Sequence, residues 1–137
     1  MEEGKQKILL DTNILIHLLR RDKNVREHIL QIGWNKCCIS EISVVELLYG
    51  AECSANVNKN RALVRELIDH MQIIAFGICI EEFCKQKAQL RQKGQIIEDN
   101  DLYIASTALV LGIPVASENV KHLSRIEGLE VQNWIKR

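Results

Sequence analysis

Short apolar runs alternate along the chain with longer segments whose apolar positions recur at helical spacing. The first run, Ile8–Leu10, is unbroken and leads directly into Asp11. Such a run is typical of a strand that is buried on both faces, as in a parallel sheet. The residues after Asp11 show helical spacing, so Asp11 is expected on the turn between a strand and a helix. In open α/β sheets, this turn at the carboxyl end of a strand is where ligands bind.

The same pattern predicts further elements in alternation. The predicted strands are Ile8–Leu10, Cys37–Ile39, Gln72–Phe76, Pro114–Ser117 and Glu130–Val131. The predicted helices are about Thr12–Arg21, Asn24–Gln31, Ser40–Gly50, Lys59–His70, Glu81–Arg91 and Asp99–Leu111. The polar segment Ala55–Asn58 is expected to be a mobile loop. Alternation of this kind favours an α/β fold, with a central parallel β-sheet flanked by helices in an α/β/α sandwich. Without linkers or repeats, residues 1–137 are expected to form a single domain.

Composition narrows the class of protein. The 137 residues are 47% hydrophobic and 26% charged with a formal net charge of zero, which disfavours a protein that coats nucleic acid but leaves room for a local basic rim. No apolar run approaches the ~20 residues of a membrane-spanning helix. The segment Met1–Lys5 does not resemble the start of a signal peptide. The five cysteines include no CxxC pair, so we expect reduced, mostly buried thiols in a cytoplasmic protein.

Asp11 has two interpretations when it is considered alone. Asp and Asn are favoured at helix starts, so either Asp11 or Asn13 would serve only as a cap. The alternative is a functional carboxylate, and it gains weight if other acids reach the same end of the sheet.

Glu46 is the second informative acid. It lies in a predicted helix, Ser40–Gly50, that is apolar almost all round, so we expect Glu46 to be largely buried. A buried ionised acid is unfavourable unless it is paired or holds a cation, and no lysine or arginine lies within one helical turn. A distant arginine or a solvent-facing orientation is the alternative.

Asp101 is the third, in the acidic run that begins the last long helix. It shares a face with small residues at helical spacing, which permits close approach to a sheet. We therefore expect Asp101 to point inward near the strand tips, with Glu98 one turn before it. Asp99 and Asn100 are interpreted as helix caps that point elsewhere.

Ser117 and Asn119 follow another predicted strand and would join the acids at this edge, although an ordinary polar turn also explains them. Three inward carboxylates repel one another unless a proton or a cation lies between them. Oxygen ligands suit Mg²⁺ or Mn²⁺ better than zinc. Such a site activates water and neutralises charge on a phosphodiester, which is the chemistry of metal-dependent nucleases.

These residues carry a resemblance to a known family. The chain resembles the PIN-domain family and, within it, the VapC-type toxin ribonucleases of bacterial toxin–antitoxin pairs. The resemblance rests on short segments that follow the family's order and cover nearly the whole chain. These segments are Leu10–Ile16, Ser40–Gly50, Asp101–Ala108, Ser117–Asn119 and Gly128–Trp134.

The resemblance implies an Mg²⁺-dependent endoribonuclease, with Mn²⁺ as a possible substitute. Asp11, Glu46 and Asp101 would form the acidic metal-binding triad, and Asn119 would occupy a fourth catalytic position. The side chains that would orient these ligands or the attacking water are Thr12, Asn13, Ser117 and Glu98. The resemblance also implies an RNA substrate, a homodimer, and a small VapB-type antitoxin that blocks the acidic pocket and binds operator DNA.

Two features depart from the family pattern. Ser117 stands where threonine is usual, and His122-Leu123 replaces a common acidic-aromatic pair. A fourth acid is therefore not expected, and one tightly held Mg²⁺ fits better than two.

Other classes fit less well. A haloacid-dehalogenase-like phosphatase requires a second aspartate where Asn13 stands, and a response-regulator receiver requires an early acidic pair. Two alternatives within the PIN fold stay open. One is an RNA-processing nuclease, whose relatives often carry zinc-binding cysteine pairs or extra domains. The other is a catalytically inactive module that binds RNA or protein, which the presence of all three acids disfavours.

Two basic clusters are candidate contacts to RNA phosphates. The early cluster is Arg20, Arg21, Lys23 and Arg26, and the late cluster is Lys85, Lys87, Arg91 and Lys93. A solvated helix face is the alternative for each, and the sequence leaves open which cluster forms the rim. Aromatic residues make up only 4% of the chain, so base stacking is not expected to set specificity.

Overall fold

Short parallel strands form the centre of the molecule. The computed structural model describes residues 6–135. Its strands are β1 (Ile8–Leu10), β2 (Cys37–Ser40), β3 (Gln72–Ile74), β4 (Val115–Ala116) and β5 (Val131–Gln132). They form one five-stranded sheet in the order β3-β2-β1-β4-β5, in which every pairing is parallel. The predicted parallel sheet is confirmed.

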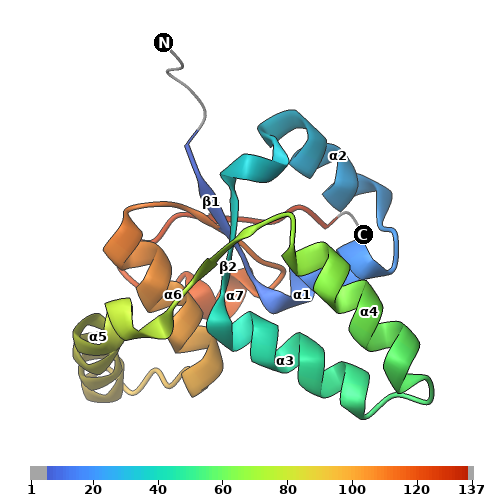
Figure 1. Cartoon of the computed structure of the whole chain (residues 1–137). Coiled ribbons are helices and arrows are strands. Elements are labelled where there is room, and N and C mark those ends of the chain that lie inside the picture. The colour runs from blue at the N-terminus through green and yellow to red at the C-terminus, as the bar shows by residue number, and fades with distance from the viewer. Residues whose placement is uncertain (1–5, 136–137) are drawn as a thin grey trace.

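Helices cover both faces of this sheet. They are α1 (Thr12–Leu19), α2 (Lys23–Ile32), α3 (Glu41–Glu52), α4 (Val57–Ile68), α5 (Ile80–Gln92), α6 (Asp99–Leu111) and α7 (Val120–Leu123). Two 3₁₀ turns, η1 (Trp34–Lys36) and η2 (Phe76–Cys79), complete the described elements. Figure 1 shows α1, α2 and α4 on one side of the strands and α5 and α6 on the other, which confirms the predicted α/β/α arrangement.

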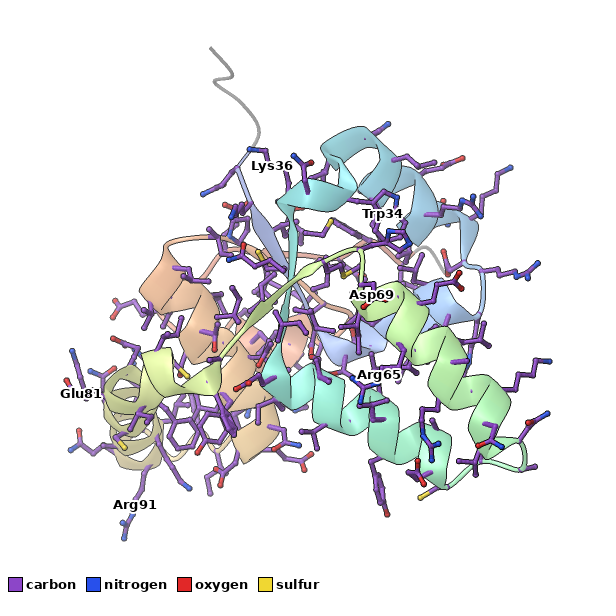
Figure 2. The ribbon with its side chains drawn as sticks, in the orientation of Figure 1. Trp34, Lys36, Arg65, Asp69, Glu81 and Arg91 are labelled. Carbon is purple, nitrogen blue, oxygen red and sulfur yellow. The ribbon has the colours of Figure 1, made fainter. Side chains whose placement is uncertain are left out.

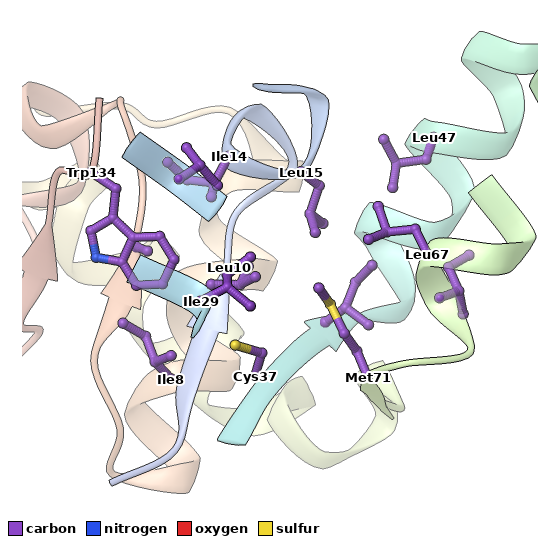
Figure 3. Close-up of a cluster of buried hydrophobic side chains, with 14 of the residues drawn as sticks. Ile8, Leu10, Ile14, Leu15, Ile29, Cys37, Leu47, Leu67, Met71 and Trp134 are labelled. Carbon is purple, nitrogen blue, oxygen red and sulfur yellow. The ribbon is translucent and has the colours of Figure 1, made fainter. Parts of the chain in front are cut away.

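The sheet separates two hydrophobic cores, which explains the unbroken apolar character of β1. Leu9 and Leu10 are both fully buried, but they point to opposite faces and belong to different clusters. Leu10 packs with residues of α1, α2 and α4 and with Trp134 near the C-terminus (Figure 3). Leu9 packs against α5 and α6 through residues such as Phe83 and Leu102. A strand that is covered on both faces has no position for a polar side chain.

Several predicted boundaries shift by one or two residues, and one prediction is wrong in part. The predicted mobile loop Ala55–Asn58 is half helical, because α4 begins at Val57. The Asn56 side chain accepts a hydrogen bond from the Lys59 backbone N–H at 3.4 Å and so caps this helix. The first helix was predicted to end at about Arg21, but α1 ends at Leu19. Arg21 itself has a left-handed backbone conformation, with a φ of 65°.

Two expectations from composition concern the chain as a whole. No helix in the part of the chain that the structure describes is long and apolar enough to cross a membrane. All five cysteines are free, and Cys37, Cys38 and Cys79 are buried, which confirms mostly buried thiols. The segment Met1–Lys5, on which the signal-peptide expectation rests, lies outside the described residues.

Candidate active site

The carboxyl ends of β1, β2 and β4 lie side by side because β1 pairs with both other strands. Asp11 directly follows β1, and its backbone N–H donates to the carbonyl oxygen of Ala116 in β4 at 2.9 Å. Glu46 comes from α3, which follows β2 directly, and Asp101 lies in the first turn of α6. The topology therefore brings three distant segments to one edge of the sheet.

Asp11 is the most buried of the acids, with 3% of its surface exposed. The Ser117 hydroxyl donates to its Oδ2 at 2.6 Å, and the Thr12 backbone N–H donates to its Oδ1 at 2.8 Å. The amide nitrogen of Asn13 lies 3.4 Å from the same Oδ2. Asp11 also stands at the N-cap of α1, so capping and a functional role are both compatible with its position.

The environment of Asp11 disfavours its ionised form. The pKa of Asp11 is raised from 3.8 to about 6, mainly by burial, while the hydrogen bonds from Ser117 and Thr12 oppose this rise. The negative charges of Asp101 and Glu46 contribute to the same rise in pKa. These three carboxylates therefore interact electrostatically across the sheet edge.

Glu46 is held by a short relay of hydroxyl groups. The Thr12 hydroxyl donates to Glu46 Oε1 at 2.5 Å, and the Ser43 hydroxyl lies 2.8 Å from the Thr12 oxygen. Because the Thr12 proton is given to Glu46, Ser43 is the donor to Thr12. The side-chain amide of Asn100 donates to the other oxygen, Glu46 Oε2, at 3.1 Å.

The expectation that Glu46 is largely buried is wrong, because its side chain is only partly buried. The helix α3 is not covered all round: Val45 is 61% exposed and Tyr49 is 69% exposed. Apolar residues on this helix therefore do not all mark core positions, and the face of Glu46 borders an open hollow.

Asp101 is partly buried and points toward the same edge. Ala105 and Ala108 behind it are fully buried, as the strip of small residues predicts. Burial raises the pKa of Asp101, and the charges of Glu46 and Glu98 raise it further. The Asn119 side-chain amide donates to Asp101 Oδ2 at 3.1 Å.

An acidic hollow of about 310 Å³ opens above these groups. Its lining side chains are Glu46, Glu98, Asp99, Asn100 and Asp101. The interpretation of Asp99 and Asn100 as caps that point elsewhere is wrong, since both line the hollow and no side chain caps α6. The predicted placement of Glu98 beside Asp101 agrees with the structure.

Hydrogen bonds join the sequence-predicted residues into one network. Thr12 contacts both Asp11 and Glu46, while Ser117 bonds Asp11 and accepts from the Asn119 backbone N–H at 2.9 Å. Asn119 in turn reaches Asp101. The Asn13 side-chain oxygen accepts from the backbone N–H of Glu118 at 3.0 Å, which fixes the turn after β4.

Sequence reasoning missed other side chains in this region. Besides Ser43 and Asn100, His122 Nδ1 lies 2.7 Å from Asn119 Oδ1. His17 lies between two carboxylates, 3.3 Å from Asp22 and 3.1 Å from Glu118. Helical spacing was the available signal for two of them, since Ser43 lies three residues before Glu46 and His122 three residues after Asn119.

No lysine or arginine offsets the charge of the three acids in the part of the chain that the structure describes, although His122 lowers the pKa of Asp101. Within residues 6–135, neither Asp11, Glu46 nor Asp101 forms an ion pair with a lysine or an arginine. In the same range, no three His, Cys, Asp or Glu side chains converge closely enough to enclose an ion as they stand. Hydroxyl and amide groups thus separate the three acids; Glu46 and Asp101 line the hollow, while Asp11 is buried at the same edge of the sheet.

Apolar grooves flank the acidic hollow on two sides. One groove, between α1, α3 and α4, includes Glu46 and Arg20 of the early basic cluster. The other, between α5 and α6, includes Glu98 and Asp99 together with Lys87 and Arg91 of the late cluster. Each basic cluster therefore reaches the surroundings of the acids.

Comparison with known proteins identifies the family to which this fold is similar. Residues 8–129 match a family model described as PIN domain. The chain is 33% identical over 132 residues to Ribonuclease VapC2 of Haemophilus influenzae, which covers 94% of this chain and 98% of that protein. It is 32% identical to the tRNA(fMet)-specific endonuclease VapC of Salmonella typhimurium, over 93% of this chain and 98% of that protein.

Solved structures with the same fold include two VapBC structures. The DNA-bound VapBC complex of Salmonella typhimurium contains a chain with a TM-score of 0.90 and 28% identity, which covers 96% of this chain and 100% of that one. VapBC2 of Rickettsia felis, bound to a DNA fragment from its promoter, gives a TM-score of 0.89 and 28% identity over 95% of this chain and 100% of that one.

Proposed function

The chain belongs to the PIN-domain family, and on that premise we propose that it is a VapC-type toxin, an endoribonuclease that hydrolyses RNA phosphodiester bonds with metal-activated water. The observation that carries this proposal is the set of three mutually repelling carboxylates, which no lysine or arginine among the described residues neutralises. Acids held together without a counter-charge are suited to bind a cation.

The donor chemistry of the site fits a hard divalent ion. Carboxylate oxygens of Asp11, Glu46 and Asp101 are the ligands that Mg²⁺ and Mn²⁺ prefer, and no cysteine or histidine competes among them. We assign the binding of Mg²⁺ to these three residues. The ion, when bound, would lower the pKa of a water and offset negative charge on the phosphodiester.

The surrounding side chains have positioning roles. Ser117 and Thr12 hold the carboxylates of Asp11 and Glu46 through hydroxyl donors. Asn119 acts in the same way on Asp101, with its own amide held by His122. Such groups around metal ligands fix their orientation and typically contribute 10–100-fold to metal affinity or activity.

The proposed partner is a VapB-type antitoxin, by analogy with the complexes that the structural neighbours form. Its docking site would be the groove between α1, α3 and α4, of about 370 Å³. Ile16, Leu19 and Leu63 line this groove, which suits the apolar face of an amphipathic helix. Because Glu46 also lines it, a segment bound here would reach the acidic hollow.

Three further assignments complete the proposal. A homodimer is supported by exposed apolar side chains at another hollow, where Ile78, Ile80 and Val110 are 44%, 59% and 45% exposed. The free cysteines fit a cytoplasmic location. Residues 1–137 as a whole are assigned to one domain.

The decisive test compares the wild type with Asp11→Asn on structured RNAs that include tRNA(fMet), with Mg²⁺ or Mn²⁺ and with chelator. We expect cleavage that depends on the ion and falls at least ~100-fold in the variant, since a metal ligand matters more than the groups around it. Equal cleavage by both proteins, or cleavage that survives chelation, excludes this mechanism. RNA binding without cleavage by the wild type favours the inactive binding module instead.

A further inference from the structure

The groove between α5 and α6 adjoins the acidic hollow on the side away from Arg20. It encloses about 350 Å³ and shares Glu98 and Asp99 with the hollow. Its apolar wall consists of Leu90, Ile97 and Leu102, each of which is largely buried. A molecule that occupies the hollow therefore has an apolar surface directly beside it.

Ile96 is the unusual residue of this groove. Its side chain is 78% exposed, whereas that of its neighbour Ile97 is 6% exposed. The backbone around Ile96 is nevertheless anchored, because Arg125 Nη1 donates to its carbonyl oxygen at 3.0 Å and the Gln95 N–H donates to Leu90 at 2.9 Å. An apolar side chain held in solvent beside an active site is suited to contact a ligand.

Two basic side chains lie at the rim of the groove, and only one of them is paired with an acid among the described residues. Lys87 is held in place, with its Nζ 2.9 Å from Asp99 Oδ1 and 5.7 Å from the centroid of the Phe83 ring. Arg91 is exposed and forms no ion pair within residues 6–135, and Figure 2 shows its side chain extending outward from α5. Its guanidinium is therefore available to an external anion, and its planar geometry suits a phosphate.

We propose that this groove binds one nucleotide of single-stranded RNA, next to the phosphodiester that lies over the acids. The base packs on Ile96 and the apolar wall, and Arg91 pairs with a phosphate. This inference rests on the proposed nuclease function and adds the direction in which the RNA leaves the acids. Arg91 of the late basic cluster then contacts RNA, while Arg20 of the early cluster lies in the groove assigned to the antitoxin.

A nucleotide fits this groove better than a peptide helix does. A docked helix needs a row of apolar anchors along several turns, whereas this wall is short and a free cation stands at its edge. An apolar wall makes no hydrogen bonds to base edges, so it distinguishes bases by size and shape. We therefore expect a preference between purine and pyrimidine at one position beside the cleaved bond.

The test measures binding of a short fluorescein-labelled single-stranded RNA by the full chain in chelator, where cleavage does not intervene. In Arg91→Gln, the slope of log affinity against log salt should fall by about 0.7, the value for one phosphate contact to a single strand. In Ile96→Ala, affinity should fall roughly three- to tenfold at an unchanged salt slope, because an apolar contact is lost. Cleavage in Mg²⁺ by Ile96→Ala should lose the base preference.

Matched controls lie outside the groove. Arg65→Gln removes an exposed arginine on α4 that belongs to neither basic cluster, and Leu30→Ala removes a side chain that is 60% exposed on α2. Both should bind and cleave like the wild type. If Arg91→Gln and Ile96→Ala also do so while Asp11→Asn is inactive, the subsite is wrong and the nuclease proposal stands.

Two other outcomes also overturn the subsite. A reduced salt slope in Arg20→Gln but not in Arg91→Gln places the RNA on the opposite side of the acids. Normal RNA binding with lost inhibition by a VapB-type peptide in the groove variants assigns the groove to the antitoxin. If the wild type neither binds nor cleaves RNA, the proposed function itself fails.

Discussion

At the scale of single residues, Asp11 couples the stability of the protein to its chemistry. Its carboxyl group is nearly inaccessible to solvent and is surrounded by other acids, so it carries its charge only at a free-energy cost. The hydroxyl of Ser117 and the backbone of Thr12 reduce this cost without removing it. A bound cation therefore stabilises this site more than it would stabilise a site whose carboxylates are already neutralised.

This cost predicts a specific dependence of stability on pH. The pKa of Asp11 is about 6 in the folded chain and 3.8 as its ordinary value, so between these values the folded state holds more protons. The free energy of unfolding in metal-free buffer should therefore fall as pH rises from 4 to 6, by about 3 kcal/mol at most from this group. The stabilising contribution is present in full below pH 3.8 and is lost as pH rises through about 6.

Asp11→Asn removes this titration, so the variant should be more stable than the wild type above pH 6 and similar to it near pH 4. Urea unfolding in the presence of chelator, at intervals from pH 4 to 8, measures the difference. Asp69→Asn is the matched control, since Asp69 is exposed at the end of α4 and should leave the profile unchanged. A wild type and an Asp11→Asn variant with parallel profiles would contradict the assignment.

Some contacts of the candidate site could be predicted from the sequence, and others could not. The meeting of Asp11 and Asp101 could be predicted because one follows a strand and the other lies in the first turn of a helix at the same edge of a parallel sheet. Glu46 stood out because no lysine or arginine lies within one helical turn of it. The contacts of Asn100 and His122 could not be predicted, because they depend on how the first turns of α6 and α7 pack across the hollow. The sequence pattern indicates which residues share one face of a helix, but it does not indicate how far apart two helices lie.

At the scale of elements, the order and type of the long segments followed from periodicity, while the coverage of each helix did not. The apolar pattern of α3 predicted a helix buried all round, yet Val45 and Tyr49 are exposed. Apolar residues on a helix are expected at a subunit or partner interface as well as in a core, and the sequence does not distinguish these cases. Short strands such as β4 likewise end where their hydrogen bonding to neighbouring strands ends. The residue types in the strand do not specify that position.

Two glycines, one at a helix end and one inside a helix, provide a matched test of backbone conformation. Gly112 ends α6 with a φ of 67°, whereas Gly50 lies inside α3 with no positive φ and no atom within 4 Å of an added Cβ. Gly112→Ala should therefore lower the free energy of unfolding by about 1 kcal/mol, and Gly50→Ala should raise it by up to ~1 kcal/mol. Urea unfolding of the two variants, side by side, checks these opposite signs.

At the scale of the whole molecule, the zero net charge conceals an uneven distribution. Acids concentrate at one edge of the sheet, whereas Arg20 lines one flanking groove and Lys87 and Arg91 line the other. In the proposed arrangement, one groove receives the antitoxin and the other a nucleotide, and both approach the same acids. A partner in the first groove would then inhibit through Glu46 while the second groove stays accessible.

The same concentration of acids predicts that divalent ions stabilise the folded chain. Mg²⁺ at one hundred times its Kd should add about 2.7 kcal/mol to the free energy of unfolding, which is measurable as a higher Tm. The gain should be smaller at pH 5 than at pH 7.5, because binding must then displace the proton of Asp11. Asp101→Asn should lose most of the gain, whereas Asp69→Asn should keep it. Equal stabilisation of both variants would mean that the ion binds elsewhere, and the acids at the sheet edge would then need another explanation for their unpaired charge.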